Sequence, residues 1–359
     1  MAATIYGILG LPDAQRTIQS IGQVVIYDAI QQLLARHNAD LNSVLGTFVG
    51  STTSTPEETY AAGGGGMMQE SDRLTRPAAV KAGQRYTVGY PLRDARDQIA
   101  GDDVTYAYMS LADLQVQVQN IFMRHINWTR FNVLKSFLNN ANYTFEDETL
   151  SQRLIAVKRF ANLDGTIYPP TIQMTLDGAD DQHYLVAGYL SSAISNANNP
   201  FVPIRNEIRE HFGDGNVVVF INSAQQAVVE ALTNFIEYTD PMIAQPVDQP
   251  RIVGRAPSDV PGTITGRINN CWVSVWDFVP PDYMVATDLD ADPPLRKRVD
   301  AVPVAGSGNL ALIARQQEFP LEEAFWRCRQ GFGVANRLNG VVMQFKASGN
   351  YDIPAGYAL

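Results

Sequence analysis

The sequence predicts a folded α+β protein built around one long helix, a charged hairpin and several short strands. Residues 110–141 repeat apolar side chains at three- and four-residue steps, with no Gly or Pro between them. Residues 50–105 read as strands on either side of a glycine-rich stretch, and residues 213–235 read as a strand leading into a capped helix. The 359 residues, 45% hydrophobic and 18% charged, suffice for about two domains and argue against disorder.

The first element is an amphipathic helix expected over residues 13–37. Asp13 is a suitable N-cap, because its carboxylate can accept hydrogen bonds from the unpaired amides of the first turn. The apolar positions that follow helical spacing are Ile18, Ile21, Val25, Ala29, Leu33 and Leu34. We therefore expect a helical arm at this end of the chain.

Residues 50–105 predict a long hairpin that projects from the body. The glycine run Gly63–Gly66 lies in polar surroundings, and strand-like alternation resumes around Val80 and over residues 86–88. A compact domain rarely holds so long an irregular stretch unless the stretch is functional or mobile. No Gly-Lys-Ser/Thr follows the glycines, so we do not interpret them as a phosphate-binding loop.

Charge is segregated along this hairpin. Between residues 73 and 96 the only acid is Asp94, whereas six residues are basic: Arg73, Arg76, Lys81, Arg85, Arg93 and Arg96. Acidic residues flank the stretch on both sides. A charge run of this kind is commonly a solvated loop. The alternative interpretation is an arm that grips an acidic surface on a neighbouring subunit.

The long helix expected over residues 110–141 carries the strongest periodic signal. Ser110 is its predicted N-cap, and Asp113 at the third helical position forms a variant capping box. At 1.5 Å per residue the helix would span about 46 Å, which is longer than a small domain is wide. His125 lies on the apolar stripe, where we interpret it as a core or groove histidine rather than a catalytic one.

Shorter elements of both kinds follow the long helix. Their expected order is strands within 152–176, a helix over 183–196, a helix over 201–212, a strand over 217–221 and a helix to about 235. Asn222 or Ser223 caps the last of these helices. Residues 236–309 are rich in proline and are expected to be loops around one strand at 271–279. Strand character returns over residues 310–346.

Residues that usually carry catalysis or bind metals are sparse. Cys271 and Cys328 cannot form a disulfide framework and are expected to be buried thiols. The four histidines are scattered in the sequence and offer little for a zinc site; they are His37, His125, His183 and His211. No Gly-x-Ser-x-Gly or His-Glu-x-x-His pattern occurs. We therefore predict no catalytic residues, no enzyme activity, no cofactor and no bound metal.

Charge and hydropathy limit the partners and the cellular location that the sequence allows. The formal net charge is −10, and neutralising nucleic-acid phosphates needs a surplus of Lys and Arg, so the chain is a poor candidate for a nucleic-acid clamp. No run of 18 apolar residues predicts a membrane span, and the first residues lack the basic region of a signal peptide. The sequence therefore favours a protein made and kept in a cytoplasm, away from membranes.

The order of elements is a helical arm, a charged hairpin, a long helix, an α/β unit, proline-rich loops and closing strands. This order resembles the major capsid proteins of tailed bacteriophages, which have the Hong Kong 97-type fold. The closing segment RCRQGFGVANRLNGVVMQF is similar to the last strands of that family. The helix ending in FLNNANYTF resembles its spine helix, and HYLVAGYL with GDGNVVVFINSAQQAVVEAL resembles its axial domain.

This resemblance implies a division of the chain. The regions are an N-terminal arm at 1–49, an extended loop at 50–105, a peripheral domain at 106–179 with spine helix 110–141, an axial domain at 180–305 and return strands of the peripheral domain at 306–359. The basic residues of the extended loop would then lie at subunit interfaces. Pentamers and hexamers would self-assemble into an icosahedral shell that encloses double-stranded DNA without sequence-specific binding. The resemblance also implies a portal and a decoration protein as partners, and a place in the virion after assembly in the host cytoplasm.

Two further features of the family bear on single residues. Some members crosslink a Lys of the extended loop to an Asn of a neighbour; the candidates here are Lys81 with Asn336 or Asn339, and we favour a shell without this crosslink. Other members carry an N-terminal scaffolding segment that a protease removes. Because the arm begins soon after Met1, a separate scaffolding protein is expected instead.

Two other functions remain open at this point. An encapsulin, a bacterial compartment shell protein with a related fold, would be expected to have a shorter arm and loop, so the long stretch 50–105 favours the phage protein. A soluble α/β enzyme would need titratable groups converging on a cleft, and the sequence contains no motif that predicts them.

Overall fold

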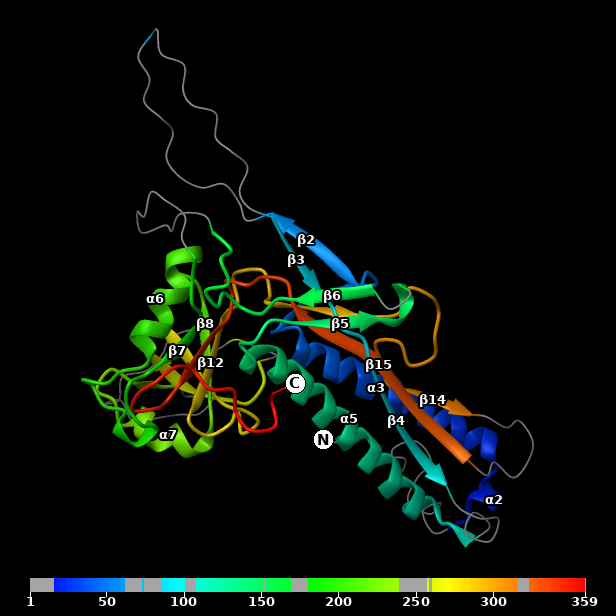
Figure 1. The fold of residues 1–359 in the computed structure, drawn as a ribbon. Helices are drawn as coiled ribbons and strands as arrows, with labels where there is room; N and C mark the ends of the chain where they lie inside the picture. Colours follow the sequence, from blue (N-terminus) through cyan, green and yellow to red (C-terminus); the bar gives the residue numbers. More distant parts are fainter. Residues whose placement is uncertain are drawn as a thin grey trace.

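The computed structural model describes residues 16–61, 73, 85–100, 108–150, 153–168, 180–238, 257, 260–314 and 323–358. Two bodies lie side by side in Figure 1. One is a sheet with the helices α6 (Phe201–Phe212) and α7 (Ser223–Glu230), and the other is elongated along the helices α3 (Gln23–Leu45) and α5 (Leu111–Leu138). The two bodies share α5, which reaches from one into the other.

The first body is built on a seven-stranded mixed sheet. Its strands, in spatial order, are β7 (Tyr184–Val186), β16 (Val341–Gln344), β12 (Tyr283–Asp288), β8 (Val217–Ile221), β11 (Cys271–Val275), β10 (Thr263–Ile268) and β9 (Ile236–Glu237). The strand predicted at 217–221 is therefore central. The predicted cap is also confirmed, because the Asn222 side chain accepts a hydrogen bond from the amide of Ala224.

Each face of this sheet buries its own hydrophobic core. All five residues of β8 are buried, and successive side chains point to opposite faces. Val219 belongs to the core that contains Ile204 of α6. Phe220 belongs to the other core, where its ring lies 5.1 Å from that of Phe48. A strand buried on both faces reads as a continuous apolar run, which is the pattern VVVFI shows.

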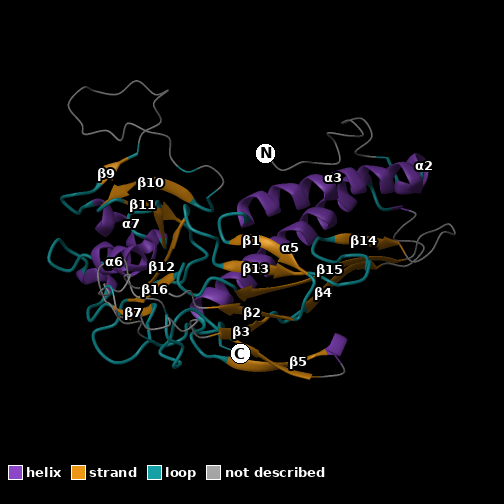
Figure 2. Cartoon of the chain, turned by 90° about the horizontal axis from the view of Figure 1, so that it is seen from above, coloured by secondary structure: helices purple, strands orange, loops and turns teal. Residues whose placement is uncertain are grey.

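The second body contains a five-stranded sheet around one long strand, β15 (Glu323–Val334). The other strands are β4 (Arg93–Ala100), β14 (Ala311–Ala314), β13 (Leu295–Arg298) and β1 (Val49–Thr53). β15 pairs with β4 along one edge and with β14 and then β13 along the other, all antiparallel. Figure 2 shows α3 and α5 on one side of this sheet, with the β2 and β5 strands towards the other side.

Glycine at residue 331 permits a close approach within this sheet. A Cβ atom at Gly331 would lie 1.7 Å from the carbonyl oxygen of Pro91, which no side chain can tolerate. The backbone of β15 therefore lies in direct contact with the turn that leads from β3 (Arg85–Gly89) to β4. This contact positions the hairpin discussed below.

The long helix α5 confirms the strongest prediction from the sequence. Ser110 and Asp113 form the predicted capping box, each side chain accepting from the other residue's amide. The helix ends at Leu138, three residues before the predicted end, and its 28 residues span about 42 Å. Its first half packs in a core with α3 and β15, and its last two turns pack in the core under the seven-stranded sheet.

The predicted arm helix is present but is broken at Gly22. The short helix α2 (Ile18–Ile21) ends there, and α3 begins at the next residue and continues to Leu45, beyond the predicted end at residue 37. Gly22 has φ +100°, a conformation that glycine adopts far more readily than other residues. The observed N-cap is Thr17, whereas the predicted cap Asp13 lies outside the described residues.

Two predictions for shorter elements are wrong. Within 183–196 the chain forms the strand β7 and a single 3-10 turn (η3, Ser191–Ala193) instead of a helix, because residues 184–186 add to the sheet edge beside β16. The stretch 236–309 contains five strands, β9 to β13, where the sequence predicted one. Of the strands expected within 152–176, residues 153–157 form β6 (Arg153–Val157), residues 166–168 are not in a strand, and residues 169–176 lie outside the described part.

Candidate functional site at the base of the hairpin

Two antiparallel strands form the base of the predicted hairpin. β2 (Glu57–Ala61) pairs with β3 in a register that sets Ala61 opposite Arg85 and Tyr60 opposite Tyr86. The rings of these two tyrosines stack with centroids 5.7 Å apart. In Figure 1, β2 runs outward from the body and β3 returns to it. The residues between Ala61 and Arg85, except Arg73, lie outside the described part.

A hydrogen-bonded cluster fixes the β2 side of this base. The Tyr60 hydroxyl lies 2.5 Å from a carboxylate oxygen of Glu58 and 2.6 Å from the hydroxyl of the buried Tyr90. Glu58 also accepts from Thr53 at 2.7 Å and forms an ion pair with Arg296 of β13. Burial raises the pKa of Glu58, but the hydrogen bonds from Tyr60 and Thr53 outweigh it, so the pKa is lowered overall. Burial, followed by the bond to Glu58, raises the pKa of Tyr60 to about 12.

A buried ion pair is the second network at the hairpin base. Arg298 of β13 donates to Asp147, at the end of strand β5 (Tyr143–Asp147), at 2.5 Å, and both side chains are only 2% exposed. Arg298 also donates to the backbone oxygen of Tyr90 at 2.7 Å and lies within reach of Thr149. One guanidinium group thus joins β13, the end of β5 and the turn after β3.

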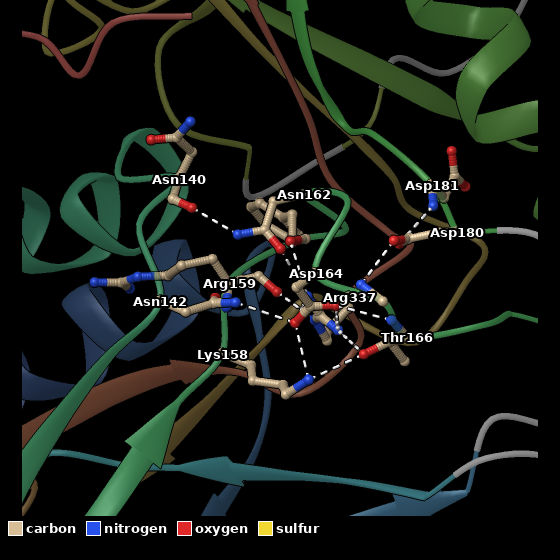
Figure 3. A network of polar contacts seen from close by, with 12 residues as sticks. Asn140, Asn142, Lys158, Arg159, Asn162, Asp164, Thr166, Asp180, Asp181 and Arg337 are labelled. Carbon is tan, nitrogen blue, oxygen red and sulfur yellow. Dashed lines mark hydrogen bonds and ion pairs between the residues drawn. The ribbon is translucent and has the colours of Figure 1, made fainter.

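Arg337, in the loop between β15 and β16, is the centre of a third network (Figure 3). Its side chain is fully buried and donates to Asp164, to Thr166 and to the backbone oxygen of Arg159. The same guanidinium lies 5.5 Å from the ring of Tyr86 on β3. Hydrogen bonds and the Arg337 charge lower the pKa of Asp164 despite its burial, so this carboxylate remains ionised.

Together these three networks link the hairpin base to β13, to the end of β5 and to the loop between β15 and β16. The charged groups of these networks are paired within the chain and hold the hairpin base in position. Sequence reasoning missed all three. The signal that could have indicated the first two is the alternation in LRKR: Arg296 and Arg298 face the hairpin base, while Lys297 between them points to Asn42.

The predicted basic patch is only partly within the described residues. Arg76 and Lys81 lie outside them. Arg73 and Arg85 are exposed, and neither forms an ion pair with another described residue. Arg96 is also exposed, but it pairs with Asp94 of its own strand at 2.7 Å, and Asp94 is shared with Arg327 of β15.

The flanking acids that lie within the described residues, Glu57, Glu58 and Asp97, are also paired within the chain. Asp97 of β4 forms an ion pair with Arg124 of α5 at 2.8 Å. Positive and negative side chains therefore alternate on the surface beside β4. Binding of this basic patch to a neighbouring subunit stays a prediction.

The two asparagines named as crosslink candidates have different surroundings. Asn339 is fully buried, and its amide donates to the backbone oxygens of Asp288 and Asp292 while its oxygen accepts from the amide of Asp288. Asn336 is half-buried and donates to the backbone oxygen of Asp292 at 3.0 Å. The amide of Asn339 is thus fully occupied.

The histidines, which look scattered in the sequence, form two pairs. His37 of α3 and His125 of α5 are hydrogen-bonded at 2.9 Å, and burial lowers the pKa of His125 to about 3. His125 therefore is neutral in the groove between the helices, as its position on the apolar stripe indicated. His183 and His211 lie 3.3 Å apart beside Asp181 and are considered below as possible metal ligands. Cys271 and Cys328 are buried free thiols, as predicted.

Comparison with solved structures identifies the fold. A chain from Mycobacterium phage Patience superposes with a TM-score of 0.67 at 17% identity, over 93% of this chain and 92% of that chain. The mature capsid of bacteriophage PhiM1 matches at 9% identity over 83% and 86% of the two chains, with a TM-score of 0.49. The capsid of cyanophage P-SCSP1u matches at 8% identity over 84% and 86%, with a TM-score of 0.48. Only the first TM-score exceeds 0.5, and it confirms the predicted Hong Kong 97-type α+β fold.

Other comparisons give no further match. No protein-family model and no curated protein matches the sequence. In the described part of the chain, no helix combines the length and the apolar character that a membrane span requires.

Proposed function

We propose that this chain is the major capsid protein of a tailed bacteriophage, which assembles into an icosahedral shell around packaged double-stranded DNA. The observation that supports this most directly is the similarity of the fold, over 93% of the chain, to a chain of a mycobacteriophage. It agrees with the resemblance already read from the order of elements in the sequence.

The arrangement of the chain suits a shell subunit. The elongated body around α5 and β15 would form the peripheral part of a capsomer wall, and the body around the seven-stranded sheet would be the axial domain. The hairpin mounted on β2 and β3 would be the extended loop, lying over an adjacent subunit with its basic residues against acidic ones. A net charge of −10 would let the shell enclose DNA without gripping it.

Several finer features of this proposal go beyond the fold. The subunits would form pentamers and hexamers and would be components of the virion, built in the host cytoplasm. A separate scaffolding protein, a portal and a decoration protein are the partners we expect. The chain itself would have no enzymatic role.

Expression of the full chain, alone and with its scaffolding protein, is expected to give hollow particles of megadalton mass. The measurement is light scattering together with negative-stain electron microscopy. Shells that enclose a cargo enzyme in place of DNA would favour a compartment protein. A compact monomer under both conditions, with a radius of gyration of about 21 Å, would contradict the proposal.

Mature shells are expected to be held together without covalent crosslinks between Lys81 and an asparagine. The amide of Asn339 is buried and fully hydrogen-bonded, so a lysine of a neighbour could reach it only after the loop 335–340 unfolds. Boiled shells should run on a denaturing gel as one band near 39.5 kDa. A ladder of multimers that disappears in the Lys81→Arg variant but persists in Lys346→Arg would overturn this expectation.

A further inference from the structure

Five titratable side chains gather where α6 packs against residues 180–183. The set consists of Asp181, His183, Glu207, Glu210 and His211. His183 is fully buried and the side chain of His211 is 5% exposed, although 27 residues separate them in the sequence. The cluster lies away from the hairpin base, and the proposed shell function gives it no role.

Three ligand-type atoms converge on one point. His183 Nε2 lies 3.3 Å from His211 Nε2 and 3.3 Å from Asp181 Oδ2, and His211 Nε2 lies 2.5 Å from the same Oδ2. Zinc bonds to nitrogen and oxygen are about 2.0–2.2 Å long, so atoms at neighbouring corners of a tetrahedral zinc site are about 3.3 Å apart. Two of the three separations have this value. A circle through the three atoms has a radius of about 1.8 Å, so a point at zinc-bond distance from all three exists with little movement.

The orientation of His183 leaves a lone pair directed at this point. Its Nδ1 lies 2.9 Å from the backbone oxygen of Gly340, which can only accept, so Nδ1 carries the proton and Nε2 is free to bind a metal. A metal-binding histidine commonly donates its other N–H to a backbone carbonyl in this way. Without metal, His211 donates its Nε2 proton to Asp181. Metal binding displaces that one proton.

Three acidic side chains, Asp181, Glu207 and Glu210, lie around this point. Among the described residues, no Lys or Arg forms an ion pair with Asp181, Glu207 or Glu210. The two arginines of α6, Arg205 and Arg209, pair with Asp214 instead. Burial, together with the Asp181 and Glu210 carboxylates, raises the pKa of Glu207 to about 8.

We propose that Asp181, His183 and His211 bind a divalent transition-metal ion of the zinc type. Glu210 lies beside this set, with a carboxylate oxygen 3.6 Å from His211 Nε2. The Glu207 carboxyl lies next to that of Asp181. Two imidazoles favour zinc, cobalt or nickel over calcium and magnesium, which prefer sites made only of oxygen atoms.

The ion would link two segments that are distant in the sequence, residues 181–183 and α6. The amide of His183 donates to the backbone oxygen of Ala161, and the amide of Leu163 donates to that of Asp181. Through Ala161 and Arg337 this strip is continuous with the network of Figure 3, where Asp181 is labelled at the edge. The opposite ligand, His211, belongs to α6. A bound metal therefore links the support of the hairpin to the helix that covers the seven-stranded sheet.

Zinc titration of the full chain tests the proposal. The protein is stripped with a chelator and titrated with Zn²⁺ against a chromophoric competitor, and bound zinc is counted by elemental analysis. We expect one zinc per chain and a thermal midpoint that rises with zinc concentration. Replacing zinc with Co²⁺ should give the intense visible absorption of tetrahedral cobalt, whereas Ca²⁺ and Mg²⁺ should not compete.

Matched variants locate the site. His211→Gln and His183→Gln should each weaken zinc binding by at least about 100-fold, because even loss of an outer partner of a metal ligand costs 10- to 100-fold. His37→Gln, the same change in the other histidine pair, should bind zinc as the parent does. Failure of the parent chain to bind zinc, or undiminished binding by both cluster variants, would overturn the proposal. Should a cluster variant not fold, the cobalt spectrum of the parent decides alone: its absence overturns the proposal.

Discussion

Replacing Asp147 with Asn is expected to lower the free energy of unfolding by about 3–5 kcal/mol, because it leaves the buried Arg298 without a counter-charge. Asn has the shape of Asp and can still accept the hydrogen bonds that Thr149 donates. The change therefore isolates the charge. Denaturant unfolding of the full-length subunit measures the effect.

Asp97→Asn is the matched control. Its partner Arg124 is 68% exposed, and pairs in solvent contribute about 0–1 kcal/mol. Equal losses for the two variants would show that the buried position of Asp147 adds nothing.

Acid should weaken the same contact. Burial raises the pKa of Asp147, but Arg298 and Thr149 outweigh burial and the pKa is lowered overall. The stabilisation is thus present above the pKa of the unfolded chain, about 3.9, and is lost as the pH falls through the lower folded value. The gap between the parent and Asp147→Asn should close in acid.

Replacing residues 62–84 with a two-residue Asn-Gly turn is expected to abolish shell assembly while leaving the subunit folded. Ala61 and Arg85 face each other in the β2–β3 ladder, so a short turn can join them without changing the register. Among the described residues, the contacts that hold the base lie outside the deletion, since Glu58, Tyr60 and Tyr90 remain. Removing the extension deletes only the part proposed to reach a neighbour.

Two readouts separate assembly from folding. The thermal midpoint of the variant subunit should stay within a few degrees of the parent, and electron microscopy should find no particles. A Gly/Ser segment of the original length in place of 62–84 is the control for shortening, and it should also fail to assemble if the side chains of this stretch make the contact. Shells of normal size from the deleted chain would contradict the extended-loop assignment.

Local patterns in the sequence were sufficient for elements that carry their own signals. α5 has an uninterrupted apolar stripe and the Ser110–Asp113 capping box, so its start is read correctly. β8 and its following cap at Asn222 are marked by a run of β-branched residues and a capping side chain. In both cases the structure adds the partners against which the element packs and moves the end of the helix.

Elements that depend on partners distant in the sequence could not be predicted from local patterns. β12 has no alternation because all six of its residues are buried between β8 and β16, and flanking prolines suggested a loop. The sequence of β13 is that of a charged segment that would be expected in solvent. Arg298 is nevertheless buried, where it pairs with Asp147, which lies 151 residues earlier in the chain. The His183–His211 pair likewise depends on how α6 packs, which no spacing in the sequence reveals.

The pairing of β15 has a consequence for how the chain is made. Glu323–Gln330 pair with β4, more than 200 residues earlier, and β16 lies between β7 and β12 in the other sheet. Neither sheet can close until the last strands have left the ribosome, and contacts of such high sequence separation form slowly. A chain broken off during translation lacks β15 and β16, and hence a finished surface on either body. In the shell proposed above, incomplete subunits would therefore be unable to enter a growing lattice, and the topology of the chain would itself exclude unfinished subunits from the assembly.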